Sequence, residues 1–274
     1  MLNINTNYAA AFASNAAKSA SGGLNSAMEK LSTGSRINYA KDDAAGQAIS
    51  TRLSAEIQGL SMASRNAADA QSMLDTAEGA MQETHTILLR MRELAVQSAN
   101  GTLTNTDRDH TDAEFQQLSA EITRISDNTK WAGKNLIDGS ASDLAFQIGE
   151  GANQTITVAI ADISATATGI AIADDDLQNV ANAQTAIAAL DTAIATVSSE
   201  RGKLGAVSNR LVSTMTNLDQ VSVNLSASQG RIQDADFAQE TGNLSKNQIL
   251  QQAATAMIAQ ANASKSSVLA LVRG

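Results

Sequence analysis

The stretch LSAEIQGLSMASRNAADAQSMLDTAEGAMQETHTILLRMRELA, residues 53–95, decides the fold because apolar residues recur in it every seven positions. One series consists of Leu53, Leu60, Ala67, Leu74, Met81, Leu88 and Ala95. A second series, three residues after members of the first, consists of Ala63, Ala70, Ala77, Thr84 and Met91. Roughly six heptads of this kind are typical of a coiled-coil seam. The pattern predicts one helix from about residue 44 to 99, roughly 80 Å long at ~1.5 Å per residue.

The same spacing returns far downstream. One series there is Ala183, Leu190, Val197, Leu204, Leu211, Leu218 and Leu225, and the other is Ile187, Ile194 and Met215. Three polar residues interrupt the seam, and we expect them to face solvent or a neighbouring molecule: Arg201, Ser208 and Ser222. Neither stripe can bury itself, so we predict that the two helices pack together.

The region between these helices changes period. After a break at NGT, residues 100–102, helical spacing resumes through Phe115, Leu118, Ile122 and Ile125. Residues 144–160 alternate around Gly149 and Gly151, which predicts a β-hairpin. We expect the small, polar residues 161–179 to form a surface excursion.

Composition supports a helical chain. Proline is absent, although average usage of about 5% would place roughly 14 in a chain of this length. Because proline breaks helix interiors, its absence favours long uninterrupted helices. The predicted fold class is mainly α, with long antiparallel helices forming coiled-coil-like bundles and a small β-hairpin region.

Charge and cysteine usage exclude several classes of protein. No cysteine is present, which removes disulfides, thiolate metal sites and cysteine nucleophiles. A net charge of −9 disfavours nucleic-acid binding, which needs a basic face. The N-terminal residues lack the pattern of a secretory signal, and no stretch approaches the ~20 apolar residues of a membrane span. These observations alone indicate a cytosolic protein.

Both ends of the chain carry weak amphipathic helices without an evident partner in a globule. The apolar positions of the first end are Ile4, Tyr8, Phe12, Leu24, Met28 and Leu31. Those of the other end are Leu250, Ala254, Met257, Ile258, Ala261, Val268 and Val272. A chain with apolar helices at both extremities is expected to associate.

Five stretches in order resemble the signature segments of bacterial flagellin: KLSTGSRINYAKDDAAGQAIS (30–50), RELAVQSAN (92–100), WAGKNLIDG (131–139), SSERGKLGAVSNRL (198–211) and QANASKSSVLALVRG (260–274). The resemblance covers nearly the whole chain and implies a minimal flagellin without outer variable domains. It implies an inner domain of paired terminal helices and a second domain of long helices with a β-hairpin. The resulting division is 1–42 with 229–274 for the inner, D0-like domain and its connecting spoke, and 43–139, 140–178 and 179–228 for the D1-like domain.

The resemblance also implies a function. Flagellins polymerise into the helical filament used for swimming, so we expect a homo-polymer whose terminal helices are covered by neighbouring subunits. Further implied partners are the flagellar cap, the hook–filament junction proteins and an export chaperone at the C-terminal helix. Flagellins leave the cell through the flagellar export apparatus without a cleaved signal peptide, which replaces the cytosolic expectation with an extracellular one.

In flagellins, the segment that residues 30–50 resemble connects the inner helix to the long helix of the second domain. We expect Gly34 and Gly46 to supply unusual backbone angles there. The polar side chains of Ser32, Ser35 and Asn38 can form local turns. Asp42 or Asp43 can cap the following helix.

Many flagellins are detected by a host Toll-like receptor that contacts the second domain. The matching positions here are Arg90, Leu94 and Glu114, whereas Leu89 departs from the glutamine usual in recognised members. The alternative is that Arg90 and Glu114 serve filament packing alone.

Catalytic, cofactor and metal sites are not expected. His85 and His110 are the only histidines and have no cysteine or second histidine nearby in sequence, so we expect them in surface packing. The run DDD at 174–176 is more typical of a solvated loop than of a cation site. Two other functions stay open: a hook–filament junction protein of the same organelle, and an unrelated coiled-coil adaptor.

Overall fold

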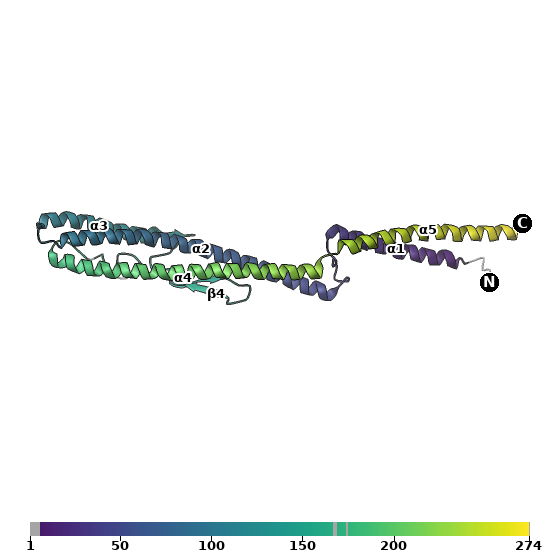
Figure 1. Ribbon diagram of the computed structural model, residues 1–274, viewed down its shortest axis with the longest axis horizontal. Coiled ribbons are helices and arrows are strands. Elements are labelled where there is room, and N and C mark those ends of the chain that lie inside the picture. The colour runs from purple at the N-terminus through teal and green to yellow at the C-terminus, as the bar shows by residue number, and fades with distance from the viewer. Residues whose placement is uncertain (1–5, 167–168, 174, 274) are drawn as a thin grey trace. The chain divides into compact units, whose positions relative to one another are not determined.

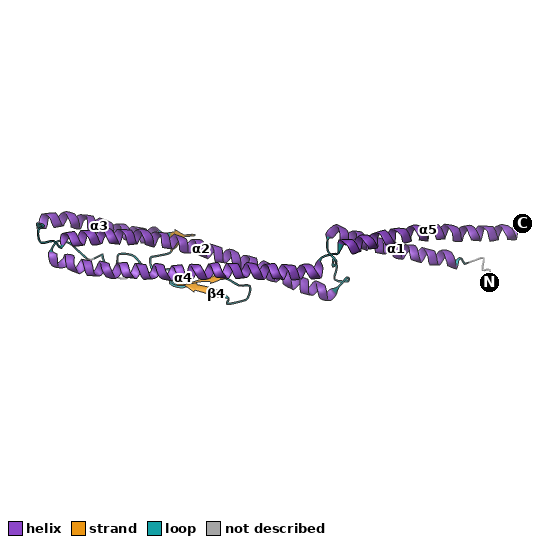
Figure 2. Ribbon diagram, in the orientation of Figure 1, coloured by secondary structure: helices purple, strands orange, loops and turns teal. Residues whose placement is uncertain are grey.

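The computed structural model describes residues 6–166, 169–173 and 175–273, and most of them are helical (Figures 1 and 2). The helices are α1 (Tyr8–Thr33), α2 (Ala44–Ser98), α3 (Asn105–Asn128), α4 (Val180–Gln233) and α5 (Phe237–Arg273). The strands are β1 (Lys130–Trp131), β2 (Lys134–Asn135), β3 (Leu144–Gln147) and β4 (Thr155–Val158). The predicted fold class, mainly α with a small hairpin region, is confirmed.

The chain divides into two compact units. The terminal unit contains the residues up to Ala55 and those from Asn224 onward, and the central unit contains Glu56–Val223. Both divisions fall inside continuous helices, α2 and α4. The domain boundaries expected from the sequence, after residues 42 and 228, stay a prediction.

In the central unit, α2 and α4 run antiparallel. Ser64 bonds to Asp219, Gln71 to Ser208 and Arg92 to Asp191, so rising numbers on α2 meet falling numbers on α4. The predicted seam residues of this unit are buried: Leu60, Leu74, Met81, Leu88, Leu190, Val197, Leu204, Leu211 and Leu218. Leu53, which belongs to the terminal unit, is buried as well. Seam residues of both helices, Leu74 and Leu204 among them, lie in one buried core, which agrees with the heptad spacing.

Two polar interruptions of the second seam have partners inside the chain. Arg201 donates from Nη2 to Glu78 Oε1 at 2.7 Å and to Gln82 Oε1 at 2.9 Å. Ser208 Oγ accepts a hydrogen bond from Gln71 Nε2 at 2.7 Å. The expectation that Arg201 and Ser208 face only solvent or a neighbouring molecule is therefore wrong, because α2 supplies complementary polar groups at the same level.

The helix α3 begins with a capping box. Thr104 Oγ1 accepts from the Asp107 backbone N–H, and the Asp107 carboxylate accepts from the Thr104 N–H at 3.0 Å. The Thr104 hydroxyl also donates to Asp107 Oδ2 at 2.7 Å, and this bond, followed by the one from the Thr104 N–H, lowers the pKa of Asp107. Farther along, Phe115 and Ile122 are fully buried in the core, as their helical spacing predicts.

A buried arginine joins the start of α3 to the end of α2. Arg108 is 5% exposed, and its Nε donates to the carbonyl of Ser98 at 3.0 Å. Its Nη2 donates to the carbonyl of Asn100 at 3.0 Å. A helix leaves its last carbonyls without intrahelical donors, and a cation there also complements the helix dipole. The Arg108 guanidinium therefore terminates the 55-residue helix α2.

Two hairpins follow α3. The predicted one is confirmed: β3 pairs with β4 antiparallel, with Leu144 opposite Val158 and Phe146 opposite Ile156. The other, β1 with β2, was not predicted. Its two central residues, Ala132 and Gly133, have φ of 48° and 84°, and positive φ at both positions is what a type I′ turn requires. The sequence did not indicate this turn, because the first position holds alanine and not the asparagine, aspartate or glycine that type I′ turns prefer.

The expectation that residues 161–179 form a surface excursion is wrong. The side chains of Ile163, Ile170, Ile172 and Leu177 are buried in the central core. The end of the segment is also anchored, since Ser98 Oγ donates to the Leu177 carbonyl at 2.6 Å and the Leu177 N–H donates to Asp112 Oδ1 at 2.9 Å. Small and polar residues separate these apolar side chains, and the segment has no continuous helical or alternating pattern, so the sequence analysis did not indicate their burial.

Among the described helices, none has a stretch long and apolar enough to cross a lipid bilayer.

Candidate functional site

In the terminal unit, α1 and α5 pack side by side and antiparallel (Figure 1). Asn7 Nδ2 donates to the Ala261 carbonyl at 3.2 Å near one end, and Lys30 meets Glu240 at 3.4 Å near the other. The residues that α1 and α5 bury are small: Ala13, Ala20, Ala27 and Ala254. Small side chains let helices approach closely but bury little apolar area.

At Gly23 the two helices leave little space for a side chain. A Cβ added there would lie 2.7 Å from Nδ2 of Asn247 on α5. By contrast, a Cβ added to the neighbouring Gly22 would meet nothing within 4 Å. A side chain at position 23 would therefore displace the Asn247 amide from the pair, and the apolar positions expected from the sequence did not include Gly23 or the buried alanines of α1.

Large apolar side chains of the terminal unit remain exposed. Five of the predicted inner-domain positions are in this group: Tyr8, Phe12, Met28, Leu250 and Met257. The predicted positions Leu24, Leu31, Ile258 and Ala261 are half-buried. The sequence analysis missed two further exposed apolar residues of α5, Phe237 and Ile249. We call these exposed and half-buried residues the apolar surface of the α1/α5 pair; the described residues cover it only in part.

Four predicted positions remain, of which one is buried and three fall outside the described residues or side chains. Ala254 is buried within the chain, so its prediction as an intersubunit contact is corrected: its methyl group is already covered in the α1/α5 pair. Ile4 and the side chains of Val268 and Val272 lie outside the part of the chain that the structure describes.

The connector from α1 to α2 is paired with the connector from α4 to α5. Ser35 and Asp234 form an isolated β-bridge, in which the Arg36 N–H donates to the Gln233 carbonyl at 2.6 Å. Arg36 Nη2 also donates to the carbonyl of Ile232 in the last turn of α4 at 2.8 Å. Residues 30–50 therefore hold the α1–α2 connector against the α4–α5 connector through hydrogen bonds within the terminal unit.

Several predicted roles within this connector are now assigned. Gly34 has φ of 70° and ends α1 in the left-handed region, as expected. Asp43 caps α2 by accepting from the Gly46 N–H at 2.9 Å, whereas Asp42 accepts from the N–H groups of Asn38 and Tyr39. The prediction for Gly46 is corrected: φ is not positive there, and a Cβ would lie 2.7 Å from Ile37 Cδ1.

On the central unit, Arg90 and Glu114 are brought together. Nε and Nη2 of Arg90 donate to Glu114 Oε1 at 3.0 and 2.9 Å, and Nη1 donates to Glu93 Oε2 at 3.1 Å. The hydrogen bonds with Glu114 and then Glu93 raise the pKa of Arg90. Leu94 is only 2% exposed and belongs to the core, so the expectation of direct receptor contact through its side chain is corrected.

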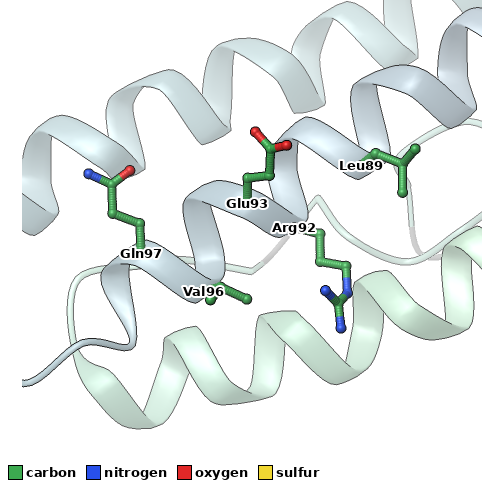
Figure 3. Close-up of a pocket in the computed structure, with 5 residues that line it drawn as sticks. All are labelled: Leu89, Arg92, Glu93, Val96 and Gln97. Carbon is green, nitrogen blue, oxygen red and sulfur yellow. The ribbon is translucent and has the colours of Figure 1, made fainter.

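A groove of about 530 Å³ lies beside this ion pair, lined by Leu89, Arg92, Glu93, Val96 and Gln97 of α2 (Figure 3). Figure 3 shows Arg92 extending toward α4, where its Nε donates to Asp191 Oδ1 at 2.6 Å. Leu89 and Val96 are exposed, so the groove presents apolar groups between charged ones. This arrangement suits contact with another protein surface.

The histidines and the acidic run singled out in the sequence can also be placed. In the ranges that the structure describes, no cluster of three His, Cys, Asp or Glu side chains could hold a metal ion. His85 is half-buried on α2 and His110 is exposed on α3. Of the acidic run, Asp174 lies outside the described residues, and Asp176 Oδ1 accepts from Asn182 Nδ2 at 2.6 Å.

Comparisons with known proteins agree with this architecture. Residues 4–142 match the bacterial flagellin N-terminal helical region, and residues 187–272 match the bacterial flagellin C-terminal helical region. The chain is 46% identical to a flagellin of Halalkalibacterium halodurans, over 90% of this chain and 91% of the relative. It is 43% identical to a flagellin of Bacillus subtilis, over 99% of this chain and 100% of the relative.

A solved structure supports the same assignment. The crystal structure of Bacillus cereus flagellin matches with a TM-score of 0.51 and 37% identity, over 56% of this chain and 88% of that chain. The alternatives of a junction protein or an unrelated adaptor are not favoured by these relatives. With both helical regions matched and close relatives covered over nearly their full length, the chain belongs to the bacterial flagellin family and is a structural subunit of the flagellar filament.

Proposed function

We propose that the exposed apolar surface of the α1/α5 pair is covered by neighbouring copies of the chain, and that this burial drives polymerisation. The observation that carries the proposal is the set of large apolar side chains that stay exposed among the described residues, Phe12 at 75% exposure among them. When two different patches meet on successive copies and the rotation does not close, an open helical polymer results.

The energetics of the pair favour folding on assembly. The two helices bury alanines against each other, whereas full burial of a Phe or Met side chain contributes about 1.5–3 kcal/mol. Most of the stabilisation available to α1 and α5 therefore comes from neighbouring copies. We infer that both helices are disordered in the free chain and become ordered in the filament.

Replacing Phe12 by alanine is expected to raise the critical concentration for polymerisation by about tenfold to a hundredfold. The physical reason is the loss of apolar area buried between copies. The critical concentration is measured by sedimenting seeded filaments and assaying the free chain. Asn25→Ala, which removes an exposed polar side chain of the same helix, is the control and is expected to have little effect. An unchanged critical concentration for Phe12→Ala would contradict the proposal.

Other flagellar proteins are proposed to meet the same apolar surface. The cap and hook–filament junction proteins would cover it at the filament ends, and an export chaperone would cover the exposed face of α5 before assembly. We also propose export through the flagellar apparatus without a cleaved signal peptide, and a working location outside the cell. The absence of cysteine supports this route, since no disulfide can block unfolding. In this proposal the role is structural, without catalysis.

A second role, recognition by a host Toll-like receptor, is proposed for the surface around Arg90 and Glu114. Their exposed ion pair beside the groove with Leu89 and Val96 favours it. Buried Leu94 would act only by supporting this surface.

We expect Arg90→Ala to lower the potency of the monomer in receptor reporter cells by about tenfold or more. The control is Arg124→Ala, which removes another exposed arginine paired with a glutamate of its own helix, Glu121. Equal potency of the wild type and Arg90→Ala would remove the receptor proposal and leave filament packing as the role of this ion pair.

A further inference from the structure

The turn between α2 and α3 contains the single Asn-Gly pair of the sequence, Asn100 and Gly101. Both residues are exposed. A Cβ added at Gly101 would contact nothing within 4 Å, and the φ of Gly101 is not in the left-handed region. The fold therefore does not require a glycine at position 101. What the glycine does change is the access to the peptide nitrogen that follows Asn100.

The side chain of Asn100 is held across the next peptide. The Thr102 N–H donates to Asn100 Oδ1 at 3.2 Å. The main chain of Asn100 is held as well, because its N–H donates to the Gln97 carbonyl at 3.2 Å and its carbonyl accepts from Arg108 Nη2 at 3.0 Å.

Two nitrogen atoms of the Asn100–Gly101 pair make no hydrogen bond in the part of the chain that the structure describes. Within the described ranges, the Gly101 N–H and the Asn100 Nδ2 have no hydrogen-bond partner. The nucleophile and the leaving group of an intramolecular reaction are thus both available, and the carbonyl between them is polarised by the Thr102 N–H.

We propose that Asn100 is a site of spontaneous deamidation. The Gly101 backbone nitrogen loses its proton to a solvent base and attacks Asn100 Cγ, which forms a new C–N bond. The negative charge that develops on Oδ1 is stabilised by the Thr102 N–H. The Cγ–Nδ2 bond then breaks, and Nδ2 leaves as ammonia with a proton from water, so that a succinimide ring remains.

Water opens the succinimide at either of its carbonyls. One product is aspartate and the other is isoaspartate, in which the main chain runs through the former side chain. The net change is one water consumed and one ammonia released, with no oxidant or reductant. Both products add a negative charge, and isoaspartate also lengthens the main chain at the carbonyl that Arg108 binds. Because the reaction needs no partner, the converted fraction increases with the age of each subunit.

The test compares wild-type full-length chain with Gly101→Ala during incubation in mildly alkaline buffer. Peptide mass mapping and isoaspartate-specific methyltransferase labelling follow residue 100 over time. We expect steady conversion in the wild type and at least about tenfold slower conversion in Gly101→Ala, which corresponds to ~1.4 kcal/mol of activation free energy. Because the added methyl group meets no atom, the variant should keep the wild-type Tm.

Asn153, an exposed turn asparagine followed by Gln154, is the reference within the same chain. The proposal is supported if residue 100 converts well before residue 153. It is overturned if residue 100 converts no faster than residue 153, or if Gly101→Ala converts as fast as the wild type.

Discussion

Replacing Leu88 by alanine is expected to lower the free energy of unfolding of the central unit by about 2–5 kcal/mol, whereas Leu89→Ala should change it by about 0.5 kcal/mol or less. The two residues are neighbours on α2, but Leu88 is 0% exposed and Leu89 is 45% exposed. Only Leu88 leaves a cavity in the seam between α2 and α4 when it is truncated. Urea unfolding followed by circular dichroism measures both values.

This pair of variants separates packing from helix propensity, because both make the same change in the same helix. A loss of similar size for the two variants would mean that α2 does not present Leu88 to the core. The comparison also bears on the groove, since Leu89→Ala changes its lining without disturbing the fold.

Replacing Arg108 by methionine is expected to lower the free energy of unfolding by about 2–4 kcal/mol, because the carbonyls of Ser98 and Asn100 lose their donors. A buried acceptor without a partner costs about 1–3 kcal/mol, and the helix terminus also loses its cation. The midpoint of urea unfolding with an unchanged slope is the measurement.

Arg124→Met on the same helix is the control for Arg108→Met. The Arg124 guanidinium meets the exposed carboxylate of Glu121, so its loss should have little effect. Arg108→Lys should recover only part of the stability, since a single ammonium lacks the planar fork that reaches two carbonyls. Full stability of Arg108→Met would show that water replaces the guanidinium without cost.

The surface that would form the filament was only partly predictable. Helical spacing identified Phe12 and Met257, which stay exposed, but it also placed Ala254 in the same group although the pair buries it. Spacing gives the face of a helix and not the identity of the partner that covers it. Gly23 escaped notice for the same reason, because its role depends on the side chain of Asn247 on another helix.

The sequence by itself determined the long helices, their seam and the predicted hairpin. The apolar residues of these elements recur at the period of a helix or of a strand. The burial of Leu74 and Leu204 could therefore be predicted from the apolar residues at heptad spacing around each of them. The tertiary structure alone decided the burial of Ile163 and Leu177, the closeness at Gly46 and the termination of α2 by Arg108. Each of these features depends on contacts with residues outside its own helix or strand. Because such contacts do not repeat along the chain, the spacing of residues cannot predict them.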